Sequence, residues 1–349
     1  MGRWMPRPGI MLGGLGMGVI VRRASWTNRA VRAAIVAALL VMAGGSAIVP
    51  NGAVVSAAPP PTAPPIVGGL RISRLSSPGR SVVSDGSAWV ATFTDGSRTV
   101  SLAGPGRTFA EASTPDRVVT QTWVRLLPAA FRGTVDTAWL ARARADRSAD
   151  VLATAFQYVS GAPSLRDAFG VQVAGDASYG PLLADGSRQE GSDFSDYLGV
   201  TWTYPDGALD PPEVDQFLAL DCSGFVRMVF GYRGGVAISL RLVAGAIPRR
   251  AFEQAASAPG IIVITNRGVV PTSRTLMAAG DLVFFDASTD DGSQLDHVGI
   301  FLGRDTAGHD RFISSRKTAD GPTMGDLAGR SVLDGTGLYA RSFRAARRI

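Results

Sequence analysis

The chain has very little cysteine, histidine or lysine, and these shortages exclude several classes of protein. One cysteine and two histidines among 349 residues exclude an internal disulfide and a cysteine-rich metal site. Lys317 is the single lysine, so almost every basic side chain is an arginine. Apolar residues make up 46% of the sequence, which is ample for a hydrophobic core and excludes an intrinsically disordered chain.

The formal net charge of +6 does not predict binding to nucleic acid. Arginines within the first 32 positions inflate this charge, and no basic stripe interleaved with aromatic residues follows them. We therefore expect no nucleic-acid partner. Nothing in the sequence indicates a metal or another cofactor, and the oligomeric state is left open.

The first 57 residues are typical of a segment that directs export. A basic, acid-free stretch precedes the uncharged run Ala33–Val49, which is too short and too rich in small residues for a comfortable membrane span. Small residues at Val55–Ala57 suit a signal peptidase. We predict that residues 1–57 are a signal peptide or an N-terminal membrane anchor, and that 58–69 are a stiff, proline-rich linker. The predicted location is secreted or in the cell envelope.

Residues 70–133 predict a small β-rich module. The short β-type runs Trp89–Phe93 and Arg98–Leu102 flank T-D-G-S, and Asp-Gly favours the tight turn of a β-hairpin. The module contains neither histidine nor cysteine. We expect it to pack on the next domain or position it, and the alternative is a separate ligand-binding module.

Residues 134–349 are predicted to form the second domain. Apolar residues at helical spacing predict a helix over Thr134–Val159. The polar stretch Pro163–Leu220 that follows is typical of a long loop, and such loops are often functional. Four aromatic residues in this stretch are expected to line a cleft or to cover the core: Tyr179, Tyr197, Trp202 and Tyr204.

The single cysteine, Cys222, lies where a helix should begin. Asp221 is a good N-cap residue, and the apolar spacing after it is helical. In the first turn, free N–H groups and the helix dipole favour a thiolate, and small Ser223 and Gly224 leave the sulfur accessible. The alternative is a buried cysteine that acts only as a small hydrophobic residue.

Three segments after this helix predict successive antiparallel strands of one sheet: Ala279–Asp286, the run H-V-G-I-F-L-G that opens with His297, and Gly308–Ser315. In this arrangement His297 can face the helix that carries Cys222. A lone cysteine with a well-placed histidine is a candidate nucleophile and base.

The motifs D-C-S-G-F-V, G-D-L-V-F-F and H-V-G-I-F-L-G, in this order, resemble those of the NlpC/P60 family of papain-like cysteine peptidases. The resemblance covers roughly residues 148–320. It implies an α+β fold, with helices packed on a central antiparallel sheet, preceded here by the small β-rich region. It also implies a secreted cell-wall hydrolase that cuts peptide bonds in peptidoglycan stem peptides, of the D-glutamate–diamino acid type.

The resemblance also assigns roles to residues. By position, Cys222 matches the family nucleophile and His297 the base. The family normally has His, Asn or Gln as a third polar residue, and Ser314 stands at the matching position of F-I-S-S. The candidate substrate-binding residues beside them are Asp221, Ser223 and Tyr204.

Ser314 is the departure from the family pattern. A serine hydroxyl can hydrogen-bond a ring nitrogen, but it is a shorter and weaker orienting group. His309, in the preceding turn, is an alternative orienting residue, whereas Arg316 would oppose a protonated imidazole. Two other functions therefore stay open: a catalytically weak or inactive wall-binding scaffold, and an amidase or acyltransferase that uses the same Cys-His pair.

Overall fold

The computed structural model describes residues 69–288 and 290–349, all within one compact unit, Val49–Ile349. The predicted export segment and nearly all of the predicted linker lie outside the described residues. Within the described ranges, no helix is both long and apolar enough to cross a membrane. The domain boundary at residues 133/134 stays a prediction.

The first sheet has five antiparallel strands, each paired with its neighbour in sequence. They are β1 (Arg71–Leu75), β2 (Arg80–Asp85), β3 (Ala88–Thr94), β4 (Thr99–Phe109) and β5 (Val118–Leu126). The predicted hairpin is confirmed, because β3 pairs with β4 and Phe93 lies opposite Val100. Gly96 in its turn has a φ of 80°, a conformation that glycine adopts without steric cost.

The single helix predicted over Thr134–Val159 is wrong, because two short helices occupy this stretch. They are α2 (Thr137–Ala145) and α3 (Val151–Phe156). Asp150 caps α3 by accepting from the N–H of Ala153, and its carboxylate also forms an ion pair of 2.6 Å with Arg107 on β4. The first helix already ends at Ala145, and Asp150 is extended as the N-cap of the second.

The stretch between α3 and the cysteine is mostly irregular, as expected, with a few short elements. They are β6 (Leu165–Arg166), β7 (Gln172–Ala174), α4 (Phe194–Leu198), β8 (Trp202–Thr203), β9 (Leu209–Asp210) and a 3-10 turn, Val214–Gln216. The helix α5 (Cys222–Val226) follows and continues as a π-helical segment, Arg227–Tyr232. Next comes α6 (Ala251–Ser257).

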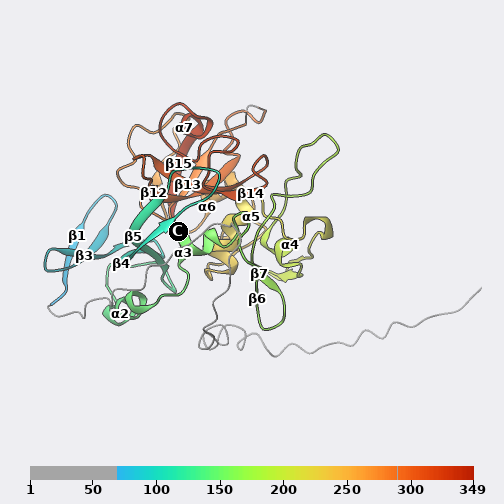
Figure 1. Ribbon diagram of the computed structural model, residues 1–349. Helices are drawn as coiled ribbons and strands as arrows, with labels where there is room; N and C mark the ends of the chain where they lie inside the picture. The colour runs from blue at the N-terminus through green and yellow to red at the C-terminus, as the bar shows by residue number, and fades with distance from the viewer. Residues whose placement is uncertain (1–68, 289) are drawn as a thin grey trace, which may run out of the picture. The chain divides into compact units, whose positions relative to one another are not determined.

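The second sheet has six antiparallel strands in the order β10-β15-β11-β12-β13-β14 (Figure 1). They are β10 (Ile261–Ile264), β11 (Leu282–Phe285), β12 (His297–Arg304), β13 (Asp310–Arg316), β14 (Gly321–Thr323) and β15 (Phe343–Arg348), which follows α7 (Leu338–Ser342). The predicted succession of three antiparallel strands is confirmed by the pairs β11–β12 and β12–β13.

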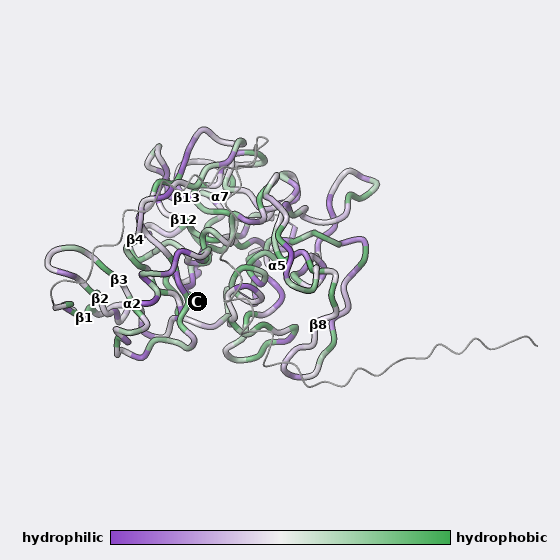
Figure 2. The backbone as a smooth tube through the Cα atoms, turned by 60° about the horizontal axis from the view of Figure 1, so that its bottom comes forward, coloured by the Kyte–Doolittle hydropathy of each residue, from purple (hydrophilic) through white to green (hydrophobic). Residues whose placement is uncertain are grey.

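The second sheet is buried on both faces. Leu282 and Phe284 of β11 lie in the same core as Phe225 of α5, whereas Val283 and Phe285 point into a separate core. Successive side chains of a strand point to opposite faces, so L-V-F-F needs no polar residue. Figure 2 shows the hydrophobic stretches of β12 and α5 in green. Burial on both faces holds β11 in place, and His297 begins the neighbouring strand opposite Phe285.

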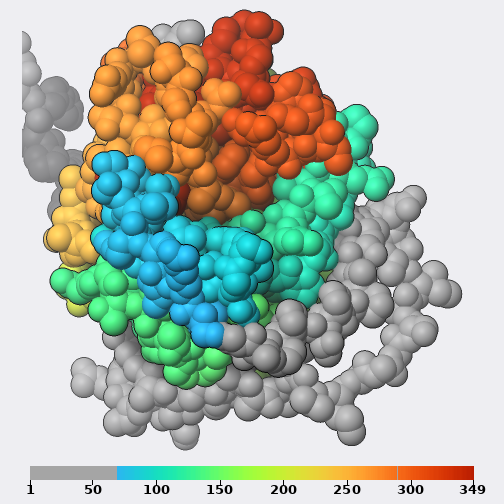
Figure 3. All heavy atoms as spheres, turned by 90° about the vertical axis from the view of Figure 1, so that its left-hand side faces the viewer, coloured from blue at the N-terminus to red at the C-terminus, as the bar shows by residue number. Residues whose placement is uncertain are grey.

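The β4–β5 hairpin joins the β-rich region to the second sheet (Figures 1 and 3). In its loop, Glu111 accepts hydrogen bonds from the hydroxyl of Thr323 (2.5 Å) and the N–H of Met324 (2.8 Å). Further along, the N–H of Thr306 donates to the carbonyl of Arg117 at 2.8 Å. The β-rich region therefore packs directly on the part of the chain that carries Cys222 and His297.

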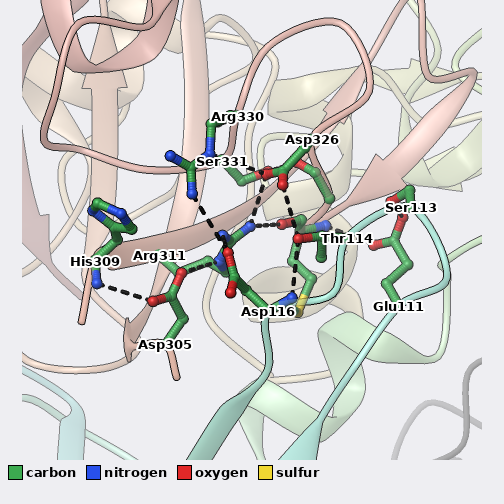
Figure 4. Close-up of polar contacts among 12 residues, drawn as sticks. Glu111, Ser113, Thr114, Asp116, Asp305, His309, Arg311, Asp326, Arg330 and Ser331 are labelled. Carbon is green, nitrogen blue, oxygen red and sulfur yellow. Dashed lines mark hydrogen bonds and ion pairs between the residues drawn. The ribbon is translucent and has the colours of Figure 1, made fainter. Parts of the chain in front are cut away.

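Arg311 is the buried centre of this junction (Figure 4). Its fully buried guanidinium forms ion pairs with Asp305 (2.7 Å), Asp116 (3.1 Å) and Asp326 (3.1 Å). Asp116 comes from the β4–β5 loop and the other partners from the second half of the chain. A charge without access to water must be paired, so these contacts hold the three segments in one arrangement.

We expect Arg311→Met to lower the free energy of unfolding by about 3–5 kcal/mol, because it leaves the buried carboxylate of Asp305 without a cation. The matched control is Arg330→Met, which removes a half-exposed arginine from the same Asp116. It should cost about 0–1 kcal/mol. Urea denaturation followed by circular dichroism measures both, and equal losses would contradict this view of the junction.

Candidate active site

Cys222 lies at the start of α5, as predicted, and Asp221 caps this helix. The carboxylate of Asp221 accepts from the N–H of Gly224 (2.7 Å) and from the hydroxyl of Ser223 (3.0 Å). Gly224 has no room for a side chain, because a Cβ there would lie 2.3 Å from the carbonyl oxygen of Ser192. The first turn is thus pressed against the preceding loop, and this contact sets the position of the thiol.

Asp221 and Ser223, predicted to bind substrate, are tied to each other and to Arg249. Arg249 forms a 2.7 Å ion pair with Asp221 and donates to the hydroxyl of Ser223 at 2.7 Å. Burial works against the charge of Asp221, but Arg249 and the hydrogen bonds hold its pKa below the usual value. Both residues border the cavity described below, with their polar groups already engaged.

The thiol of Cys222 contacts the backbone on both sides of His297. Its Sγ lies 3.9 Å from the carbonyl oxygen of Asp296, which is its one hydrogen-bond acceptor among the described residues. Burial, and then the charge of Asp221, raise the pKa of the thiol, while the N–H of Val298 and the charge of Arg249 lower it. The net shift is upward, so the expected thiolate is not the resting form. Desolvation is the largest of these effects.

His297 opens β12, and its imidazole is paired with Ser314 as the sequence predicts. Its Nε2 lies 3.0 Å from Oγ of Ser314 on β13. The ring is flanked by Phe285 and Tyr339, at centroid distances of 5.7 and 5.4 Å. Burial, and then the positive charge of Arg316, lower the pKa of His297 to about 3, against a smaller opposing effect of Asp221. The imidazole is therefore neutral near pH 7.

The other two candidates near the base have separate roles. His309 does not contact His297, because its Nδ1 lies 3.2 Å from both carboxylate oxygens of Asp334. Arg316 does reach the site, since its Nε donates to Oγ of Ser314 at 3.1 Å. The structure thus brings Ser314 and Arg316 to the base and leaves His309 at the turn before β13.

Tyr204 does not line the cavity at Cys222, which corrects its predicted contact with substrate. Only 1% of its surface is exposed, and its hydroxyl accepts from Arg227 (2.6 Å) and donates to Asp210 (2.9 Å). Arg227 is fully buried and needs these partners together with Asp193. Tyr204 is therefore part of the support beneath α5.

A cavity of about 350 Å³ opens beside Cys222. Tyr179 and Glu190 line one part of it, and Arg250 and Asp291 line others. Burial, and then the negative charge that Cys222 would carry as a thiolate, raise the pKa of Tyr179. Tyr179 was one of four loop aromatics in the sequence, and no local pattern distinguished it from Tyr204.

Three carboxylates near this cavity, those of Asp286, Asp291 and Asp296, lie within 4.8 Å of one another. Asp296 accepts from the backbone N–H groups of residues 287 and 288, and Asp286 lies 3.4 Å from Arg344. Backbone N–H groups and an arginine therefore already balance the negative charge of two of the three carboxylates. These contacts explain the cluster as part of the loop that precedes β12.

The lowered pKa of His297 predicts a pH-dependent stability. The unfolded histidine titrates at about 6.5, so protonation favours unfolding as the pH falls from about 6.5 toward 3. Above a pH of about 6.5 the imidazole is neutral in both the folded and the unfolded protein, so the stability is not reduced by its protonation. We expect His297→Gln to lose less stability than the wild type between pH values of about 7 and 4.5 in urea titrations. Parallel losses would contradict an imidazole that stays neutral in the folded protein.

Tyr204→Phe should lower the free energy of unfolding by about 1–3 kcal/mol, because it leaves a buried N–H of Arg227 without its acceptor. The control is Tyr179→Phe, whose hydroxyl borders the cavity and which should cost less. Thermal unfolding curves compare the two variants. A larger loss for Tyr179→Phe would show that the supporting role is assigned to the wrong tyrosine.

Residues 203–332 match the family model described as NlpC/P60 family. This range includes Cys222, His297 and Ser314. None of the curated proteins compared with the chain has significant sequence similarity to it. The fold is a mixture of helix and sheet, as an NlpC/P60 domain requires, whereas the papain-like arrangement stays a prediction.

Solved structures similar to the chain include an NlpC/P60 family protein from Bacillus cereus ATCC 10987, with 22% identity, 38% of this chain covered and a TM-score of 0.25. A Staphylococcus aureus Mu50 protein, described as similar to lipoprotein, NLP/P60 family, has 21% identity, 44% coverage and a TM-score of 0.25. The chain spans only 32% and 38% of these two proteins. NlpC1 from Trichomonas vaginalis has 11% identity, 89% and 97% coverage of the two chains, and a TM-score of 0.29.

Proposed function

We propose, from the NlpC/P60 domain that the chain contains over residues 203–332, that the protein is a secreted cysteine peptidase of the bacterial cell wall. NlpC/P60 proteins are generally cell-wall peptidases. The proposed substrates are peptidoglycan stem peptides, and the proposed bond joins D-glutamate to the diamino acid.

The observation that carries this proposal is the position of the single thiol. Cys222 begins α5, its sulfur lies against the backbone that flanks His297, and both Cys222 and Asp296 border a cavity. This arrangement supports a nucleophile beside the strand that carries the proposed base, at a cavity that a peptide could enter. Ser314 is proposed as the third member, because its hydroxyl bonds Nε2 of His297.

The contact with Ser314 leaves Nδ1 of His297 as the ring nitrogen that can exchange a proton with the thiol. In the proposed reaction, Nδ1 takes the proton of Cys222, and the sulfur attacks the carbonyl carbon of the substrate. A bond forms between sulfur and carbon as the carbonyl π electrons move to oxygen. Backbone N–H groups near Cys222, including its own, would stabilise this oxyanion.

The intermediate then collapses. The carbon–nitrogen bond breaks, and the imidazolium of His297 returns its proton to the departing amine. Water attacks the thioester with the neutral imidazole as base, which releases the acid and restores the thiol of Cys222. General acid–base help of this kind contributes about 10²–10⁴-fold to the rate.

The proposed location follows from the sequence before the described residues. A signal peptide over residues 1–57 would release the protein outside the cytoplasm, and retention of this segment would tether it to the membrane. In both cases the proline-rich linker would separate the folded part from the surface.

A second candidate is a catalytically weak or inactive wall-binding scaffold on the same fold. The observation that favours it is that the thiol of Cys222 donates to the carbonyl of Asp296, while burial raises the pKa of this thiol and lowers that of His297. An amidase or acyltransferase would use the same Cys-His pair, and the fold does not separate these chemistries. The bond that is cut distinguishes them.

We expect Cys222→Ala and His297→Ala each to abolish hydrolysis of purified muropeptides, because they remove the nucleophile and the base. Ser314→Ala should retain activity, since it removes a contact to Nε2 and neither the nucleophile nor the base. The control is His309→Gln, which should keep wild-type activity because His309 pairs with Asp334. Mass spectrometry of the digests identifies the bond cut. Wild-type hydrolysis by Cys222→Ala would refute the proposed function, and hydrolysis by none of the proteins would favour the scaffold.

A further inference from the structure

Arg316 touches two of the groups that surround the imidazole of His297. Its Nε donates to Oγ of Ser314 at 3.1 Å, and its guanidinium lies over the ring of Tyr339 at 4.4 Å. Tyr339 in turn flanks the imidazole. Arg316 is itself almost completely buried, at 2% exposure. Its position is therefore determined by packing, and it reaches the base through two neighbours at once.

The hydrogen bonds at Oγ of Ser314 determine which atom donates in its contact with His297. An arginine N–H can only donate, so Oγ of Ser314 acts as acceptor toward Arg316. Among the described residues, Nε2 of His297 is the one other side-chain group at this oxygen, and Ser314 is fully buried. If Nε2 carried a hydrogen, Oγ would receive two donors, and its own proton would have no acceptor. A buried, unsatisfied hydroxyl is costly, so the hydroxyl should donate to Nε2.

We propose that Arg316 is a positioning residue that acts through Ser314 to hold the neutral imidazole of His297 with its proton on Nδ1. The consequence for catalysis rests on the proposed function, in which Nδ1 must accept the proton of Cys222. With a hydrogen already on Nδ1, the resting pair is unproductive. Consistently, the thiol of Cys222 donates to the carbonyl of Asp296.

The other groups around the imidazole do not reverse this preference. Asp221, at the start of α5, acts on His297 only as a smaller opposing charge. Tyr339 of α7 presents its ring, and burial raises the pKa of its hydroxyl, so it stays neutral. Cys222 is protonated in the resting state because its pKa is raised. Among residues 69–288 and 290–349, the cation whose charge lowers the pKa of the imidazole is Arg316, from β13.

The place of Arg316 depends on the segment that follows β14. Its Nη1 donates to the carbonyl of Gly329 at 2.7 Å, and its Nη2 bonds the hydroxyl of Ser331. The β4–β5 loop holds this segment, because Thr114 donates to Asp326 at 2.8 Å (Figure 4). Contacts therefore run from the β-rich region through this segment to Arg316, and from Arg316 to the serine that bonds the imidazole.

Nitrogen-15 NMR of the histidine side chains tests this directly, since the protein contains only two histidines. Full-length protein labelled at histidine would be measured near pH 7, and His309→Gln assigns the signals of His297. We expect Nε2 to show the shift of an unprotonated acceptor and Nδ1 that of a protonated nitrogen, with this form in about tenfold excess or more. A protonated Nε2 in the wild-type protein would overturn the proposal, and this measurement needs no variant at the site.

Arg316→Met is the second test, because methionine keeps an apolar stem over Tyr339 and cannot donate to Ser314. We expect the tautomer of His297 to move toward a protonated Nε2, and alkylation of Cys222 by iodoacetamide to become about tenfold faster. An unchanged tautomer in the folded variant would also overturn the proposal. Hydrolysis of muropeptides by Arg316→Met is assayed separately: if this variant shows the expected tautomer, with Nδ1 free to accept a proton, and hydrolyses nothing, the proposed function is refuted while the role of Arg316 stands.

Discussion

The buried carboxylate of Asp221 is the interaction on which the arrangement around Cys222 depends. It caps α5, accepts from Ser223 of the same helix and pairs with Arg249, so two segments meet at one charged group. An ionised carboxylate survives at such a depth only with this number of partners. The same charge also disfavours a thiolate one residue away. The feature that positions the nucleophile therefore makes it less acidic, and the two effects have a single origin.

Buried arginines repeat this design elsewhere in the chain. Arg227, at the C-terminal end of α5, pairs with Asp193, and Arg311 joins the β4–β5 loop to the second sheet. Arg348 pairs with Asp281 and donates to Thr94 of β3. A guanidinium presents several donors in a fixed plane and is suited to binding more than one carboxylate or carbonyl. A lysine would offer no such geometry. The near absence of lysine is consistent with the use of buried arginines to join separate segments of the chain.

The two resting pKa shifts connect the supporting network with the chemistry. Burial raises the pKa of the thiol and lowers that of the imidazole, so it disfavours both charged forms of the pair. Arg316 acts in the same direction on His297 and is held by the segment that the β-rich region contacts. The β-rich region therefore contacts the segment that holds Arg316, although it contributes no residue to the cavity.

Local patterns in the sequence determined the elements that depend on neighbours in the chain. The cap Asp221, the helix start at Cys222, the hairpin around Gly96 and the pairing of β11 with β12 all follow from capping, turn chemistry and hydrophobic periodicity. The pairing of His297 with Ser314 was also predictable, since two adjacent antiparallel strands bring these positions onto one face.

Only the tertiary structure decided the features that depend on distant partners. Asp150 caps the second of two short helices and pairs with Arg107, and the hydroxyl of Tyr204 is held by Arg227 away from the cavity. Neither ion pair nor hydrogen bond to these arginines is visible in the sequence around these residues. The protonation of Cys222 and His297 was decided in the same way, because desolvation is a property of the packed surroundings and can outweigh what a local motif favours.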